Sequence, residues 1–337
     1  MSAPRFGFFF WPWSPEYTGR MAALGERLGW DLVGIADTPG NAMDPWVALT
    51  LAATRTERVG LAACVTNFRT RHPAITAGAA ASVDALSGGR MILGVGTGHS
   101  GVINVGAAAS GSAGFREGLR FTRALLAGER ASLDGATTEL PVRGRRVPVY
   151  AAASGPVALR TAGAVADGAF VNYGLQTEHV ARARALITDG AAEAERGPDD
   201  VDLWWIAGLD VSERREAALD KLGNILGFVA AYVLGPAPAE RGVPADLIPA
   251  IREMRAAYTT RRAEMDPTLV KRLGLFDYLR RRLAVAGTPD DCIEQVRAAL
   301  AAGATRLMFS VSLAADPVRT VELFGTHVLP AVTGATR

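Results

Sequence analysis

The part of this sequence best suited to chemistry is the run 96–99 (GTGH), which follows a short apolar stretch at 91–95. Glycine allows the backbone to come close to a ligand, and His99 places a titratable imidazole at the same point. Ser87 and two glycines end an Ala-rich helical pattern just before this stretch. A strand that ends in Gly-x-Gly and a polar residue is typical of ligand binding in parallel α/β proteins. The pattern predicts an active site around His99.

Two further strand-like segments end in side chains that suit a planar ligand. Residues 6–10 are followed by Trp11 and Trp13, whose indoles can line a pocket or simply cap the core. Residues 32–36 are followed by Asp37, whose carboxylate can orient a cofactor or substrate or only cap a turn. In a barrel these groups lie at the same mouth, which favours a functional role for Asp37 and for one of the two indoles.

Hydrogen-bonding groups follow two more strand-like segments. Thr66 and Asn67 would meet the polar edge of a flavin-like ring. Ser154 and Gly155 precede a helical run at 157–165, where free N–H groups, a hydroxyl and a close backbone approach suit a phosphate. An ordinary serine N-cap followed by Pro156 would have the same sequence, so both interpretations remain open.

The order of segments predicts the fold. Strand-like runs alternate with Ala-, Leu- and Arg-rich helical segments, which is typical of repeated βα units. The strand-like runs are 6–10, 32–36, 59–65, 91–95, 147–152, 168–172, 203–209 and 307–311. Eight such units favour a (β/α)8 TIM barrel over a doubly wound sheet. We expect one domain over 1–337, with a polar hairpin-like piece at 131–146 and a helical insertion at about 212–286 over the C-terminal mouth.

Composition narrows the possible partners. The chain has 337 residues, a formal net charge of +2 and 49% hydrophobic residues, and it lacks a basic run interleaved with aromatics that would indicate nucleic acid. It has no run near the ~18 apolar residues of a membrane span. Cys64 and Cys292 are too few for a disulfide framework, and four scattered histidines do not indicate a metal site. We expect a cytoplasmic protein with a small-molecule substrate.

The motifs, taken together and in order, resemble the bacterial luciferase-like flavin and deazaflavin oxidoreductases, and most of all their coenzyme F420-dependent branch, typified by methylenetetrahydromethanopterin reductase. The resemblance is carried by 44–49 (DPWVAL), 65–67 (VTN), 70–74 (TRHPA), 84–98, 100–106, 154–156 (SGP) and 286–289 (AGTP). It implies a barrel, usually dimeric, that holds the cofactor ring at its C-terminal mouth. It also implies a bulge in the third strand, often with a non-prolyl cis peptide behind the ring, here at Cys64-Val65, and the cofactor phosphate at Ser154-Gly155.

Two positions depart from the family pattern. Many deazaflavin relatives have His after the second-strand aspartate, where this chain has Thr38, and many have Asp or Glu after Gly98, where this chain has His99. A threonine hydroxyl cannot act as a general base near neutral pH, whereas an imidazole with pKa ~6.5 can give or take a proton. His99 is the candidate acid or base, although it could instead bind the cofactor tail or the partner chain of a homodimer.

The leading hypothesis is hydride transfer between C5 of coenzyme F420 and a small organic substrate, by reduction of C=C or C=N or by oxidation of an alcohol. An FMN-dependent monooxygenase on the same barrel is the alternative, and a barrel that only binds a flavin is a third. The expected site residues are His99, Asp37 and Thr38 at the reaction centre; Asp37, Cys64, Val65, Thr66, Asn67, Gly96, Thr97, Gly98, Ala153, Ser154 and Gly155 around the cofactor; and Trp11 and Trp13 around the substrate.

Overall fold

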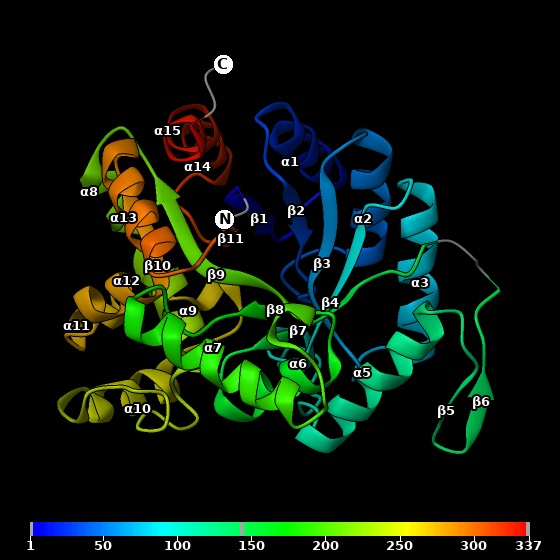
Figure 1. Ribbon diagram of the computed structural model, residues 1–337. Coiled ribbons are helices and arrows are strands. Elements are labelled where there is room, and N and C mark those ends of the chain that lie inside the picture. The colour runs from blue at the N-terminus through cyan, green and yellow to red at the C-terminus, as the bar shows by residue number, and fades with distance from the viewer. Residues whose placement is uncertain (1–2, 142–144, 335–337) are drawn as a thin grey trace.

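The protein folds as a closed barrel of parallel strands surrounded by helices (Figure 1). The computed structural model describes residues 3–141 and 145–334. The barrel strands are β1 (Arg5–Phe10), β2 (Leu32–Ile35), β3 (Gly60–Asn67), β4 (Met91–Gly96), β7 (Val149–Ala153), β8 (Gly168–Val171), β9 (Asp202–Val211) and β11 (Arg306–Ser310). β9 pairs with both β8 and β11, and β11 pairs with β1, which closes the barrel. The predicted (β/α)8 barrel is confirmed.

Each predicted strand corresponds to one barrel strand, and the bounds differ by at most two residues at either end. The sequence did not predict β10 (Ala284–Gly287), which pairs in parallel with the last four residues of β9. β9 is ten residues long and therefore extends beyond the part that pairs with β8 and β11. β10 is only four residues long and directly follows a helix, so it has little strand signal of its own.

Helices cover the outside of the barrel, and several begin with a proline behind a capping side chain. The Ser14 hydroxyl accepts the N–H of Tyr17, and the Asp44 carboxylate accepts the N–H of Trp46. The helices that cover the outside of the barrel are α1 (Pro15–Arg27), α2 (Pro45–Arg55), α3 (Pro73–Leu86), α5 (Ser112–Leu126), α6 (Pro156–Val165), α7 (Thr177–Ala192), α13 (Pro289–Ala301), α14 (Pro317–Leu323) and α15 (Leu329–Thr333). The expected hairpin is present as β5 (Ala131–Leu133) and β6 (Ala136–Thr138); residues 142–144 of that segment lie outside the described residues.

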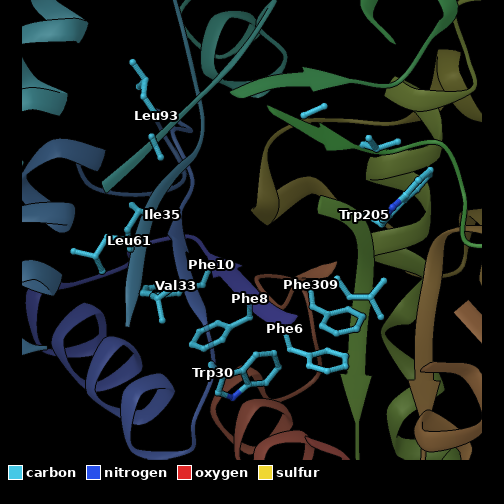
Figure 2. Packing of buried hydrophobic residues seen from close by; sticks show 14 of the residues in the cluster. Phe6, Phe8, Phe10, Trp30, Val33, Ile35, Leu61, Leu93, Trp205 and Phe309 are labelled. Atoms are coloured by element: carbon cyan, nitrogen blue, oxygen red, sulfur yellow. The ribbon is translucent and has the colours of Figure 1, made fainter. Parts of the chain in front are cut away.

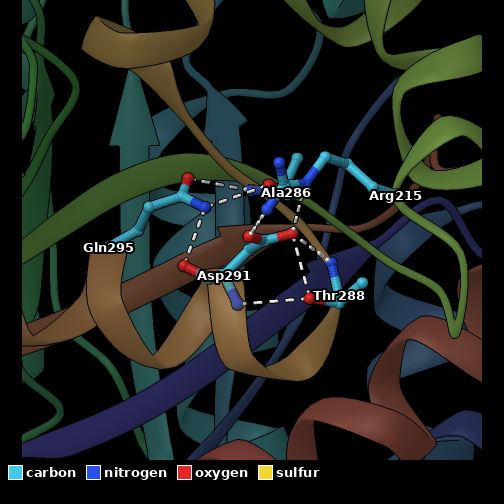
Figure 3. Close-up of polar contacts among 5 residues, drawn as sticks. All are labelled: Arg215, Ala286, Thr288, Asp291 and Gln295. Carbon is cyan, nitrogen blue, oxygen red and sulfur yellow. Dashed lines mark hydrogen bonds and ion pairs between the residues drawn. The ribbon is translucent and has the colours of Figure 1, made fainter.

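The segment between β9 and β10 is helical and is fastened at both ends. Its helices are α8 (Arg215–Asp220), α9 (Leu222–Val233), α10 (Ile248–Ala257), α11 (Leu269–Arg272) and α12 (Phe276–Leu283). Figure 3 shows Arg215 at the start of α8 paired with Asp291 of α13, while Asp291 also completes the capping box with Thr288. The Gln295 amide bonds both backbone polar groups of Ala286 in β10. These contacts hold the start of the insertion at α8 and its end at β10 against the same helix, α13.

Successive side chains of β1 point to opposite faces of the strand, which places core residues on one face and a site residue on the other. Phe6, Phe8 and Phe10 are buried between the barrel and its helices (Figure 2), where Phe8 meets Trp30 edge to face at 4.9 Å. Phe9 points to the opposite side of the strand and reaches the open end of the barrel. The inner layer consists of Leu32, Ala62, Cys64, Tyr150, Phe170, Trp204, Ile206 and Met308. In the part of the chain that the structure describes, these side chains fill the barrel below its C-terminal mouth, where the cavity begins.

Candidate active site

The C-terminal ends of the strands and helix α9 enclose one cavity, called here the mouth cavity. Most of the predicted site residues line it: Trp11, Asp37, Thr38, Cys64, Val65, Thr66, Asn67, Gly96, Gly98, His99, Ala153 and Ser154. Thr97 and Gly155 line a second cavity beside it, called here the α6 cavity, which shares Ala152, Ser154 and Tyr232 with the first. Trp13 lines neither of these two cavities.

Strand β3 is distorted where it forms the back of the mouth cavity. Its pairing with β4 shifts register between Ala63 and Thr66, which marks the predicted bulge. The Cys64-Val65 peptide is cis, as the resemblance implied. Burial raises the pKa of the Cys64 thiol, so this group stays protonated and acts as an apolar wall. A bulge re-aims the following side chains, which turns Val65 and Thr66 toward the cavity.

Asp37 and Thr66 form a polar pair on the wall made by β2 and β3. The Thr66 hydroxyl donates to Asp37 Oδ2 over 2.7 Å. Burial raises the pKa of Asp37, while the bond from Thr66 opposes this shift. Thr38 beside it is buried and accepts a hydrogen bond from the Asn41 side chain at 3.0 Å. Thr38 therefore supports the loop and, as expected from its chemistry, offers no base.

The side-chain oxygen of Asn67 stabilises the turn that follows this residue. Its Oδ1 accepts the N–H groups of Arg69 and Thr70 at 2.8 and 2.9 Å. Its Nδ2 lies on the other side, beside Gly101. Only this amino group is left to face the cavity, so Asn67 can offer a donor to a ligand and no acceptor.

His99 is enclosed by aromatic rings from the insertion. Its Nε2 lies 2.7 Å from the hydroxyl oxygen of Tyr258, and its ring centroid is 4.6 Å from that of Tyr232 and 4.9 Å from that of Phe228. Burial lowers the pKa of His99 to about 4. The expectation of a pKa near 6.5 is therefore wrong: apolar rings surround the imidazole, and it is neutral at pH 7. It can accept a proton or share a hydrogen bond, but it is not a standing cation.

The backbone before His99 requires glycine. Gly98 has φ +104°, a conformation that side chains rarely adopt. A Cβ at this position would also lie 2.7 Å from Cγ1 of Val102. The turn between β4 and His99 is thus kept tight, as the Gly-x-Gly motif predicted.

The α6 cavity contains the start of helix α6. The N-cap is Gly155, with no side-chain cap, so the interpretation of Ser154 as an ordinary N-cap is wrong. The Arg241 guanidinium from the insertion lies against Gly155 and donates to the backbone oxygens of Ser154 and Val233. Its Nε is buried without a partner. Uncapped N–H groups beside a guanidinium can hold an anion. Arg241 lies in the least recognisable part of the sequence, which is why it was missed.

The two tryptophans after β1 have different surroundings. The backbone N–H of Trp11 donates to Ser312 Oγ at 3.0 Å. The Trp11 ring packs on Phe228 with centroids 5.7 Å apart, and both rings line the mouth cavity. The Trp13 ring stacks on Tyr17 at 4.7 Å, and the Arg262 guanidinium lies 4.1 Å over its other face. Trp13 therefore helps hold the insertion and is not positioned to contact a ligand in the mouth cavity.

Sequence reasoning missed a further group of cavity residues. They are Phe9, Asn172, Ile206, Ser310, Ser312, Leu313, Ile225, Phe228, Val229 and Tyr232. Phe9, Asn172 and Ser310 lie at or just beyond strand ends, so strand alternation could have indicated them. The four residues of α9 carry no such signal, because only the folded insertion brings them over the barrel. The described residues contain no group of three or more His, Cys, Asp or Glu side chains able to hold a metal ion.

Comparisons with known proteins match this geometry over nearly the whole chain. The family described as luciferase-like monooxygenase matches residues 12–306. A 5,10-methylenetetrahydromethanopterin reductase from Methanolobus tindarius is 27% identical, covering 96% of this chain and 99% of the relative. An F420-dependent glucose-6-phosphate dehydrogenase from Rhodococcus erythropolis is 29% identical, with 98% and 95% covered.

One solved structure gives the same result for the fold. The coenzyme F420-dependent tetrahydromethanopterin reductase from Methanopyrus kandleri superimposes with a TM-score of 0.80 at 25% identity, covering 98% of this chain and 100% of that one. Across the described residues, no helix is both long and apolar enough to cross a membrane.

Proposed function

This chain belongs to the luciferase-like monooxygenase family, and we propose that it is an oxidoreductase that uses coenzyme F420 to transfer a hydride to or from a small organic substrate. Relatives that align over nearly its whole length are named as F420-dependent reductases and dehydrogenases. The observation that carries the proposal is the mouth cavity, backed by the bulge and the cis peptide of β3, with the α6 cavity directly beside it.

The residues present fit such a cofactor. Asn172 Oδ1 is buried in the cavity wall without a partner, which leaves an acceptor for a ring N–H. Val65 and Gly96 form a flat apolar back wall, and Asn67 supplies a donor. The first turn of α6 and Arg241 would hold a phosphate on the cofactor tail. Together these groups would fix a planar ring and a charged tail at separate points.

The chain's own contribution to the reaction is binding and proton handling. When bound, the deazaflavin supplies a carbon centre that gives or takes a hydride as a two-electron unit. The neutral His99 imidazole, bonded to the Tyr258 hydroxyl, can relay the proton that an alcohol loses on oxidation, or relay one back in the reverse reaction. Asp37, whose pKa is raised by burial and which is bonded to Thr66, is a further titratable group on the cavity wall. Phe228 and Trp11 pack against each other and give the cavity an apolar surface.

An FMN-dependent monooxygenase is the second candidate, and one observation favours keeping it. The pairing of uncapped α6 N–H groups with Arg241 recognises a phosphate without regard to the ring that carries it. FMN would therefore find the same tail site. The family's own description also names monooxygenases.

Titration of the purified protein with F420 and, separately, with FMN distinguishes the two. We expect F420 to bind with micromolar or lower Kd, measured by the quenching of its fluorescence. Arg241→Met should weaken this binding at least tenfold, whereas Arg252→Met, on the exposed face of α10, should leave it unchanged. Micromolar binding of FMN without binding of F420 would overturn the proposal in favour of the second candidate.

A further inference from the structure

We propose that the substrate of this site is a small, uncharged, largely apolar ketone or the corresponding secondary alcohol, and not a phosphorylated or carboxylated compound. The inference rests on the proposed function, because it concerns a part of the same mouth cavity that β3 does not form. That part is formed by the ends of β1 and β11 and by helix α9.

Apolar side chains form this part of the cavity. The side chains of Trp11 and Leu313 come from the barrel, and those of Ile225, Phe228 and Val229 come from α9. Phe228 and Val229 are only partly buried, so their surfaces are available to a ligand. Trp11 packs edge to face on Phe228 with ring centroids 5.7 Å apart, so the two rings form one continuous apolar surface. Burial of a hydrocarbon group against such a wall is favourable, because it removes apolar surface from water.

The cavity holds no positive charge for an anionic substrate. Among the described residues that line it there is no lysine or arginine, and its only carboxylate is Asp37. Arg241 lies in the neighbouring cavity and is engaged by backbone oxygens. Arg282 is fully buried and bonds the Tyr173 backbone oxygen. A phosphate in the mouth cavity would lose its hydration and meet a carboxylate without a counter-charge.

His99 forms a polar end of this cavity, and this end suits a neutral oxygen atom of the substrate. His99 faces the cavity, and its Nε2 is bonded to the Tyr258 hydroxyl at 2.7 Å. A ketone oxygen bonded to the other ring nitrogen of His99 would gain a proton relayed by the neutral imidazole, which takes one from the Tyr258 hydroxyl at Nε2 as it gives one up, and water then restores the Tyr258 proton; the ketone carbon gains a hydride from the reduced cofactor. The C=O π bond is broken, C–H and O–H bonds form, and the cofactor loses two electrons. Alcohol oxidation is the reverse.

Two related probes test the inference: cyclohexanone and 4-oxocyclohexanecarboxylate, which share a ring and a ketone and differ by one carboxylate. Binding is measured by saturation-transfer NMR and calorimetry, on the protein alone and with F420 bound, and turnover is measured with reduced F420. We expect cyclohexanone to bind at least tenfold more tightly than the carboxylate and to be the better substrate. Equal or tighter binding of the carboxylate or of glucose 6-phosphate, or no binding of cyclohexanone to either form, overturns it.

A positive charge introduced into the wall provides the matched variant. Val229→Lys should remove most of the preference for cyclohexanone, whereas Val47→Lys, 54% exposed on α2, should leave it unchanged. Retained preference in a folded Val229→Lys protein would count against the assigned wall, and the wild-type comparison decides the matter if that variant does not fold. Failure of F420 to bind would reject the proposed function alone, because the binding measurements without cofactor still report the substrate class.

Discussion

The hydroxyl oxygen of Tyr258 lies 2.7 Å from Nε2 of His99, so a residue at the end of α10 reaches across the barrel mouth to the end of β4. The contact does not stand alone. The Asn41 side chain after β2 donates to the Thr260 backbone oxygen at 2.8 Å, and the Thr260 hydroxyl donates to Asn104 Oδ1 at 2.6 Å. The insertion is therefore bonded to the loops that carry Asp37 and His99, and it takes part in positioning both.

His99→Ala is the first prediction. Cofactor affinity should stay within a few-fold, because His99 lies on the insertion side of the cavity among Phe228, Tyr232 and Tyr258. Turnover should fall by ~10²-fold or more, the scale of general acid-base catalysis. Steady-state kinetics and an F420 titration on the same preparation check both parts. Undiminished turnover would assign the proton to another group, with Asp37 the next candidate.

Tyr258→Phe tests the partner of His99. Removal of this hydroxyl leaves the ring contacts and takes away the bond that orients the imidazole, so kcat should fall about tenfold with little change in KM. Tyr17→Phe is the matched control, because the Tyr17 hydroxyl is buried without a partner. A fall in kcat that is equal in both variants would show a general loss of packing, and an unchanged pH profile with unchanged kcat in Tyr258→Phe would exclude a positioning role.

The sequence predicted the barrel strands and the residues at their ends, but not the contacts that the insertion makes with them. Each barrel strand was predicted because β-branched and apolar runs alternate with helical segments, and this pattern depends on local sequence. Parallel strands in a barrel place their carboxyl ends together, so Asp37, Thr66, Asn67 and His99 could be assigned to one site from order alone.

The surroundings of these residues could not be predicted in the same way. The pKa of His99 depends on Phe228, Tyr232 and Tyr258, which lie more than a hundred positions away in sequence. The Arg241 contact with Ser154 and the Arg262 contact with Trp13 are likewise non-local. Trp13 was assigned to the substrate because it follows a strand, but a stacking partner and a cation hold it elsewhere. Local patterns contain no information on such contacts.

The pH dependence of stability should show the buried state of His99. Its pKa in the folded protein is lowered to about 4 from an ordinary 6.5, so between these values the unfolded chain binds more protons. This group therefore removes stability as the pH falls from about 6.5 to 4. Chemical denaturation of wild type and His99→Gln across this window should show a smaller loss for the variant. His327→Gln, at an exposed position, measures the loss of an imidazole in solvent. An identical slope in wild type and His99→Gln would contradict the burial of this group.

Gly94→Ala tests whether the β3 bulge is needed for the cofactor site. A Cβ at Gly94 would lie 2.3 Å from the Ala63 backbone oxygen and 2.7 Å from Cε2 of Phe170, so β3 and β4 would have to separate where the bulge begins. We expect a loss of ~1–3 kcal/mol in the free energy of unfolding, measured by denaturant titration, together with weaker binding of F420. Gly114→Ala in α5 is the control, because nothing lies within 4 Å of its Cβ position; it should be neutral or stabilising by up to ~1 kcal/mol. Unchanged F420 affinity in a destabilised Gly94→Ala protein would separate the bulge from cofactor binding.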